Sequence, residues 1–106
     1  MPRTITSVVF FCVYVLLSLK DREHYVGCTA DLKKRVEEHE KGLVFSTKAR
    51  RPFTLIYFEG CRNEQDARQR ERYLKTTIGR RWLGTRLRNF NKKLTQYNLE
   101  NCTGLM

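Results

Sequence analysis

Three polar side chains of the sequence fall where a helix is expected to bury them. On the first predicted helix, Leu32 and Val36 form an apolar stripe. Arg35 and His39 lie on the same stripe. On the second predicted helix, Glu71 falls among the apolar positions. Burying an unpaired charge is costly, so these groups must be paired, protonated or placed at the floor of a ligand cleft.

These groups together suit chemistry on a phosphate ester. A carboxylate, an arginine and a histidine beside tyrosine-bearing strands fit metal-assisted phosphoryl chemistry, because positive groups neutralise the charge that develops on the phosphate oxygens. Structural interpretations compete with this one. Arg35 and Glu71 would then form a salt bridge between two helices. Tyr14 and Tyr25 would be a cross-strand aromatic pair, and His39 a structural side chain near a helix end.

One continuous α/β unit must position these residues, because 106 residues support only one modest core. We expect a single domain over residues 1–106, with its core at about residues 8–94 and a tail at residues 95–106. The sequence predicts strands at residues 10–19, 25–28 and 53–59, and helices at residues 31–41, 64–78 and 83–94. Thr29 or Asp31 is the expected cap of the first helix.

Glycines mark the expected helix ends. Gly42 follows the first predicted helix and Gly79 the second, and glycine is the residue that most often ends a helix. Gly84 lies inside the third predicted helix, where it lowers helix propensity. The positions of these glycines therefore set the predicted helix bounds.

The positive charge of the chain lies in its second half. The net charge is +10, and residues 48–93 hold 14 Lys and Arg against 4 Asp and Glu, whereas residues 1–47 hold 7 against 6. A basic segment favours a polyanion as partner, since neutralising phosphates releases counterions. An anionic membrane surface is the alternative, but aromatic residues such as Trp82 interleave the charges and no lipid-anchor motif adjoins them. We expect DNA as the partner, with RNA left open and no membrane.

The cysteines and the long apolar run bear on where the protein works. No CxxC pair and no zinc-site histidine spacing involves Cys12, Cys28, Cys61 or Cys102. We therefore expect free thiols in a reducing, cytoplasmic compartment, with disulfides as the alternative. The apolar run of residues 8–19 lacks a signal-peptide cleavage site and is too short to span a bilayer as a helix. Its Val, Phe and Tyr content favours a buried β-strand.

In its order of residues the chain resembles the GIY-YIG nuclease superfamily, which includes the N-terminal nuclease domain of the excinuclease that acts in nucleotide-excision repair. Small stand-alone members look most similar. Cys12-Val13-Tyr14-Val15-Leu16 stands where the family has its first signature, and Tyr25-Val26-Gly27 where it has the second. Residues 31–42 resemble the family's first helix, residues 46–57 its loop and third strand, and residues 67–75 the helix with the metal-binding glutamate.

The resemblance covers about residues 10–78 and departs from the family pattern in two places. Cys12 replaces the glycine of the first signature, which is a small-for-small change in a strand. The asparagine that follows the glutamate in the excinuclease branch has no counterpart that we can place. Gly27 keeps the glycine of the second signature, which implies a close approach to its backbone.

The resemblance implies an α/β (α+β) fold with a small three-stranded antiparallel sheet flanked by helices, and a hydrolytic site with one metal ion. Glu71 would hold one Mg²⁺ or Mn²⁺ ion. Arg35 would contact the scissile phosphate and stabilise charge in the transition state. Tyr14 would be the general base for the attacking water, or would orient it. Tyr25 and His39 would assist in positioning or proton transfer, so which of the three is the base stays open.

The expected function is a metal-dependent DNA endonuclease that acts as a monomer, with structure-specific cleavage in DNA repair or recombination as the finer expectation. Basic residues of the loop and helices would contact the DNA backbone, namely Lys48, Arg50, Arg51, Lys75, Arg80 and Arg81. One alternative is a nucleic-acid binding module that keeps the fold without cleaving. Another is a structural partner protein, in which a bridge between Arg35 and Glu71 only joins two helices. The preferred DNA structure does not follow from the sequence.

Overall fold

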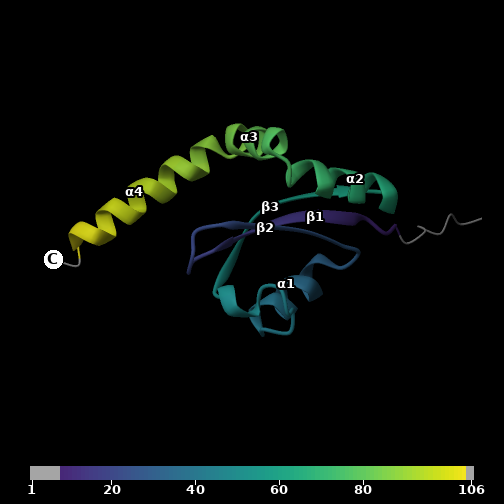
Figure 1. Cartoon of the computed structure of the whole chain (residues 1–106), viewed down its shortest axis with the longest axis horizontal. Helices are drawn as coiled ribbons and strands as arrows, with labels where there is room; N and C mark the ends of the chain where they lie inside the picture. The colour runs from purple at the N-terminus through teal and green to yellow at the C-terminus, as the bar shows by residue number, and fades with distance from the viewer. Residues whose placement is uncertain (1–7, 105–106) are drawn as a thin grey trace, which may run out of the picture. The chain divides into compact units, whose positions relative to one another are not determined.

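The computed structural model describes residues 8–104, with side chains to residue 96. The chain divides into two compact units between Arg72 and Tyr73, which are described one after the other. Figure 1 shows the elements of the first unit. They are β1 (Phe11–Ser18), β2 (His24–Thr29), α1 (Leu32–Glu40), the short 3-10 helix η1 (Lys48–Arg50), β3 (Phe53–Cys61) and α2 (Glu64–Leu74), whose last two residues belong to the second unit.

β1 is the central strand of an antiparallel sheet with the order β2-β1-β3. All residues from Val13 to Ser18 are buried, because β1 has a partner strand at each edge and a helix over each face. Figure 1 shows α1 on one face of the sheet and α2 on the other. The expected three-stranded antiparallel sheet flanked by helices is confirmed. The apolar run at residues 8–19 supplies its central strand, as predicted.

Alternate residues of β1 face the two helices, as the two-residue period of a strand requires. Tyr14 and Leu16 point to the α1 side and join a buried cluster there. The other members and neighbours of this cluster are Phe53, Tyr25, Leu32, Val36 and Leu55. On the opposite face, Arg70 of α2 pairs with Glu59 of β3 at 2.6 Å. The sheet therefore directs Tyr14 towards the helix that carries Arg35 and His39.

The ends of α1 are set by its flanking residues, as predicted. Asp31 caps the helix, and its Oδ1 accepts a hydrogen bond from the backbone N–H of Lys34 at 3.1 Å. Gly42 follows the helix with a φ of 73°, a conformation that favours glycine. Between these ends, Arg35 and His39 lie one turn apart.

The second unit contains α3 (Thr77–Arg86) and α4 (Arg88–Gly104), and its first helix break corrects the sequence prediction. The helix predicted to reach residue 78 ends at Leu74, because the Thr76 hydroxyl accepts a hydrogen bond from Gly79 N at 3.1 Å and caps α3. Gly79 therefore lies in the first turn of a helix rather than ending one. A Cβ at this position would overlap the Tyr73 carbonyl oxygen, so only glycine fits there.

The third predicted helix, at residues 83–94, is also wrong as a single element. Leu87 leaves helical geometry, with φ −105° and ψ 21°, and separates α3 from α4. Gly84 lies inside α3 and does not end it. In the expected tail, residues 95–104 continue α4, while residues 105–106 lie outside the described part of the chain. Within residues 8–104, no helix combines the length and apolar character that crossing a membrane requires.

Candidate active site

The ring of Tyr14 in β1 lies over a position of the neighbouring strand β2 that only glycine can occupy. The antiparallel register pairs Tyr14 of β1 with Gly27 of β2. A Cβ built on Gly27 would overlap the Tyr14 Oη and Cζ atoms. Tyr14 is only 1% exposed, so protein atoms surround its ring. The close approach expected at Gly27 is therefore made by the Tyr14 phenol, which occupies the space of the missing side chain.

The Tyr14 hydroxyl meets His39 of α1. A hydrogen bond of 2.9 Å joins Tyr14 Oη and His39 Nε2, although the two residues are 25 positions apart. The other ring nitrogen, His39 Nδ1, lies 2.7 Å from the Thr47 hydroxyl oxygen. His39 and Thr47 are fully buried. Tyr14, His39 and Thr47 thus form a continuous chain of hydrogen bonds in the interior.

Sequence reasoning assigned no role to Thr47. The residue lies in the basic loop, where a threonine is expected to be exposed, and its contact with His39 is non-local. Its burial is the signal that identifies it, since a buried hydroxyl must have a partner. The family-like loop that contains Thr47 was the only sign that the sequence offered.

Tyr25 packs beside this chain of hydrogen bonds. Its ring centroid is 5.1 Å from that of His39 in an edge-to-face arrangement, and 6.3 Å from that of Tyr14. The cross-strand aromatic pair proposed as a structural alternative is therefore present, and His39 completes an aromatic group with it. Tyr25 is half-buried, so its ring shields one side of the Tyr14–His39 hydrogen bond while part of it reaches the surface.

Arg35 stands one turn before His39 and carries the positive charge of the site. Its Nη1 donates to Glu38 Oε1 at 3.2 Å, with both side chains about one third exposed. Arg35 is also close enough to hydrogen-bond the Tyr14 oxygen, and this contact raises the pKa of the guanidinium. Arg35 therefore links the buried Tyr14 oxygen to the surface.

Burial sets the protonation states of Tyr14 and His39. Desolvation raises the pKa of Tyr14 to about 12, although the hydrogen bond from Arg35 acts in the opposite direction. Desolvation lowers the pKa of His39 from its usual 6.5, and the nearby Arg35 charge lowers it further. At neutral pH the resting site therefore holds a neutral phenol next to a neutral imidazole.

Glu71 lies in α2, within electrostatic range of Cys28 in β2. Its side chain is only 14% exposed and pairs with Arg68 at 3.6 Å. Burial raises the pKa of the Cys28 thiol in β2, and the Arg68 and Glu71 charges also act on that thiol. The Glu71 charge also raises the pKa of Tyr14, which shows that the carboxylate lies within electrostatic range of the phenol.

The proposed bridge between Arg35 and Glu71 is not the arrangement that the structure gives. Arg35 pairs with Glu38 three residues later, and Glu71 pairs with Arg68 three residues earlier. The first ion pair lies within α1 and the second within α2, and both are partly exposed. Pairs of this kind contribute little to stability. The structural reason for burying Arg35 and Glu71 is therefore weaker than the sequence suggested.

A cleft of about 490 Å³ opens beside Arg35. Its walls include Arg35 and Glu38 of α1, Glu64 and Arg68 of α2, and the connection at residues 28–31. Charged side chains of both signs line it, so it is a polar cleft rather than an apolar ligand pocket. The cleft gives a solvent path to Arg35 from the surface of the first unit.

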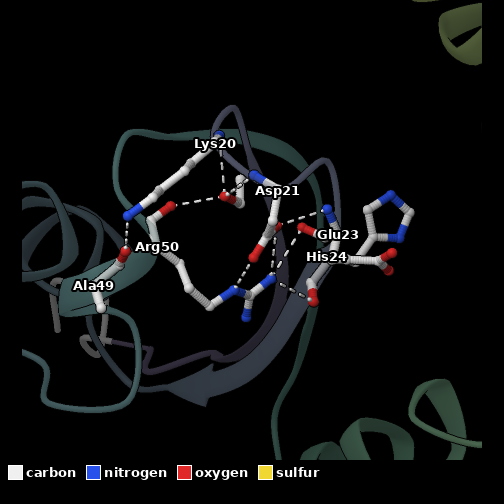
Figure 2. Close-up of polar contacts among 7 residues, drawn as sticks. Lys20, Asp21, Glu23, His24, Ala49 and Arg50 are labelled. Atoms are coloured by element: carbon white, nitrogen blue, oxygen red, sulfur yellow. Dashed lines mark hydrogen bonds and ion pairs between the residues drawn. The ribbon is translucent and has the colours of Figure 1, made fainter.

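Arg50, one of the basic residues expected to contact DNA, is engaged in a structural clamp that Figure 2 shows. Its Nε donates to Asp21 Oδ2 at 2.7 Å, and its Nη2 donates to the Glu23 carbonyl at 3.2 Å. Lys20 Nζ donates to the Ala49 carbonyl at 2.9 Å. The contact with Arg50 holds the pKa of Asp21 well below its usual range. The clamp ties the β1–β2 turn to η1, while contact of Arg50 with DNA stays a prediction.

The other predicted DNA contacts are exposed. Arg51 is partly committed, because its Nε donates to the Lys48 carbonyl at 3.1 Å and its Nη1 to the Glu40 carbonyl at 3.3 Å. Lys48 itself is exposed in η1. In the second unit, the three remaining predicted contacts are also exposed, namely Lys75, Arg80 and Arg81. Their contact with DNA stays a prediction.

Two further expectations concern cysteines and metal ligands. Cys12, Cys28 and Cys61 are free thiols, whereas the side chain of Cys102 lies outside the described residues. Within the described part of the chain, no three His, Cys, Asp or Glu side chains gather as a metal cluster. A metal site here would therefore use few protein ligands, and Glu71 is the one carboxylate that the sequence assigned to a metal ion.

Comparison with known proteins gives one family. A family model described as the GIY-YIG catalytic domain matches residues 10–84. A UPF0213 protein of Clostridium perfringens is 41% identical over 64 residues, which cover 59% of this chain and 68% of the relative. A UPF0213 protein of Pediococcus pentosaceus is 44% identical over 63 residues, covering 58% and 66%. The UPF0213 protein YazA of Bacillus subtilis is 41% identical over 64 residues, covering 58% and 64%. No solved structure matches the chain significantly.

Proposed function

The chain belongs to the GIY-YIG catalytic domain family, which is a nuclease family, and we propose that it is an endonuclease that hydrolyses a phosphodiester bond of DNA with one divalent metal ion. The observation that carries the proposal is the hydrogen-bonded pair of Tyr14 and His39 beside Arg35. A buried phenol in contact with an imidazole is an acid–base pair, and the guanidinium is the natural ligand of a phosphate. The relatives are similar over about two thirds of their length, so this activity is our proposal for the present chain.

Glu71 fits a site for one Mg²⁺ or Mn²⁺ ion. Its carboxylate is mostly buried yet reaches solvent, and it lies within electrostatic range of Tyr14. Such ions often take one or two protein carboxylates and complete their coordination with water and substrate phosphate, so a dense cluster of ligands is not needed. When bound, the ion would neutralise phosphate charge and make a water molecule more acidic.

Tyr14 supports the role of general base only together with His39. With a pKa of about 12, the phenol keeps its proton at neutral pH. It can accept a proton from the attacking water only while its own proton leaves, and His39 Nε2, at 2.9 Å, is placed to receive it. Arg35 would hold a non-bridging oxygen of the scissile phosphate and stabilise its charge. Tyr25 would position the His39 ring through their edge-to-face contact.

The exposed basic residues would contact the sugar-phosphate backbone. We assign this role to Lys48, Arg51, Lys75, Arg80 and Arg81 and leave out Arg50, whose guanidinium already serves Asp21 and two backbone carbonyls. Contacts of this kind give affinity and orientation without reading bases. Selection by DNA structure, as in repair or recombination, is therefore our finer proposal rather than selection by base sequence.

The test is metal-dependent cleavage by wild type and by Glu71→Gln, which removes the carboxylate charge while keeping the side-chain shape. Labelled flap, branched, single-stranded and duplex DNA would be incubated with Mg²⁺, Mn²⁺ or EDTA. We expect the wild type to cut in the presence of metal and Glu71→Gln to lose on the order of 100-fold or more in rate with DNA affinity retained. Asp66→Asn, a change at an exposed residue of the same helix outside the cleft, is the matched control. DNA binding with no cutting under any condition would favour the non-catalytic binding module.

A further inference from the structure

The loop after α1 holds Thr47 in one place. Its backbone N–H donates to the Val44 carbonyl at 3.2 Å, and Lys48 N donates to the same carbonyl at 2.9 Å. Leu43 N donates to the Glu38 carbonyl at 2.9 Å, which ties the start of the loop to the helix. Val44 and Thr47 are both buried. The Thr47 hydroxyl is therefore fixed against His39 by the backbone of the loop rather than by its own rotamer alone.

The hydrogens at the Tyr14 end of the imidazole can be assigned by counting donors. Arg35, which contacts the Tyr14 oxygen, has only donors, so it cannot accept the phenol hydrogen. The hydrogen of Tyr14 must then point to His39 Nε2, at 2.9 Å. This requires Nε2 to be unprotonated. A neutral His39, as burial favours, therefore carries its proton on Nδ1.

The Thr47 end gives the same assignment independently. The Thr47 hydroxyl donates to the Val44 carbonyl at 3.4 Å, a long hydrogen bond with a group that can only accept. Its oxygen is thus available to accept from His39 Nδ1–H at 2.7 Å. Both ends of the ring specify the Nδ1-protonated tautomer. The opposite tautomer would set two hydrogens against each other at Tyr14 and leave the Val44 carbonyl without the Thr47 donor.

We propose that Thr47 is a positioning residue that holds His39 in the Nδ1-protonated tautomer, so that Nε2 accepts the proton that leaves Tyr14 during phosphodiester hydrolysis. In this step the Tyr14 O–H bond breaks and an N–H bond forms at Nε2, while Tyr14 takes a proton from the attacking water. His39 becomes an imidazolium whose Nδ1–H still donates to Thr47. The catalytic part of this inference rests on the proposed nuclease function, whereas the tautomer rests on the hydrogen bonds alone.

Removing the Thr47 hydroxyl should allow the proton of His39 to move from Nδ1 to Nε2. In Thr47→Val the side-chain shape is kept, but Nδ1–H loses its acceptor in a buried place, where an unsatisfied donor is unfavourable. The proton then moves to Nε2, which can no longer accept from Tyr14. We expect kcat to fall on the order of 10- to 100-fold with KM for DNA unchanged. The reason is that Thr47 contacts His39, which takes part in the proton transfer, and not the substrate. Thr47→Ser keeps the hydroxyl and should retain the wild-type rate.

The decisive readout is the tautomer itself, measured by NMR of the two ring nitrogens in ¹⁵N-histidine-labelled protein at a pH where both histidines are neutral. We expect Nδ1–H at His39 in wild type and Thr47→Ser, and a shift to Nε2–H in Thr47→Val. His24, exposed on β2, gives the second signal and should not change. Thermal melting of each variant establishes that it is folded.

A proton on His39 Nε2 in the wild type would overturn the proposal, as would an unchanged tautomer and rate in Thr47→Val. If Thr47→Val fails to fold, the wild-type and Thr47→Ser spectra still decide the assignment. A wild type that cuts no DNA but shows Nδ1–H at His39 would count against the proposed nuclease activity and leave the tautomer assignment standing. The two claims therefore fail separately.

Discussion

Replacing Gly27 by alanine would place a methyl group where the Tyr14 phenol lies. The new Cβ would overlap Tyr14 Oη and Cζ. Tyr14 is 1% exposed in the central strand, so the ring must leave its position rather than adjust within it. Overpacking a core costs about 1–3 kcal/mol, and losing the buried hydrogen bond to His39 costs about 1 kcal/mol more. The sum is a loss of about 2–4 kcal/mol in the free energy of unfolding.

Urea denaturation followed by tryptophan fluorescence or circular dichroism would measure this loss. Gly60→Ala is the matched control, since Gly60 also lies in a strand beside β1, and its added Cβ would come no closer than 3.3 Å to the flexible side chain of Phe10. We expect Gly60→Ala to change stability by less than about 1 kcal/mol. DNA cleavage by Gly27→Ala should be lost together with the Tyr14–His39 hydrogen bond.

A double-mutant cycle isolates the cause. Tyr14→Leu shortens the side chain that fills the space over Gly27, so adding Gly27→Ala in that background should cost far less than in the wild type. An equal cost of Gly27→Ala in both backgrounds would show that the strand itself rejects the methyl group. The assignment of Gly27 to the Tyr14 phenol would then be wrong.

Two other predictions follow from pKa shifts and from the clamp. Burial lowers the pKa of His39 below its unfolded value of 6.5, so its contribution to stability is present above pH 6.5 and is lost as the pH falls through the lower folded value. The free energies of unfolding at pH 7.5 and 5.5 should therefore differ less in His39→Gln than in the wild type. An equal difference in both proteins would contradict this. Arg50→Gln should lower the melting temperature, whereas Lys48→Gln should leave it unchanged, weaken DNA binding and reduce the salt slope by about one. A larger loss of DNA affinity in Arg50→Gln than in Lys48→Gln, at a temperature where both are folded, would restore Arg50 as a DNA contact.

The sequence predicted those parts of the molecule that local rules determine. The apolar run gave β1 because a central strand is buried on both faces, and Asp31 gave the start of α1 because a cap acts within one turn. The break after Leu74 was missed, since the Thr76 cap competes with a periodicity that would carry a helix onward. The structural contacts of Arg50 were missed for a related reason. A basic residue in a loop looks free until its distant partner, here Asp21, is known.

The site shows the same division between local and distant information. The helical stripe placed Arg35 and His39 on one face, and the resemblance placed Tyr14 and Gly27 on neighbouring strands. Neither could show that the phenol fills the space over the glycine, because that contact depends on the strand register and the ring rotamer together. Thr47 depends on a loop conformation that no periodicity describes.

The protonation states of Tyr14 and His39 in the resting protein must change before Tyr14 can act as a base. Burial raises the pKa of Tyr14 to about 12 and lowers the pKa of His39 below its usual 6.5, so moving the proton from the phenol to the imidazole is unfavourable in the resting protein. In the resting protein the phenol of Tyr14 therefore keeps its proton and does not act as a base. In the proposed nuclease, the negative charge of a bound phosphodiester would favour the imidazolium form of His39, and the positive charge of a divalent cation would favour the phenolate of Tyr14. Each charge makes a different half of the proton transfer from Tyr14 to His39 more favourable. We therefore expect the Tyr14 phenolate to form only when substrate and metal ion are both bound.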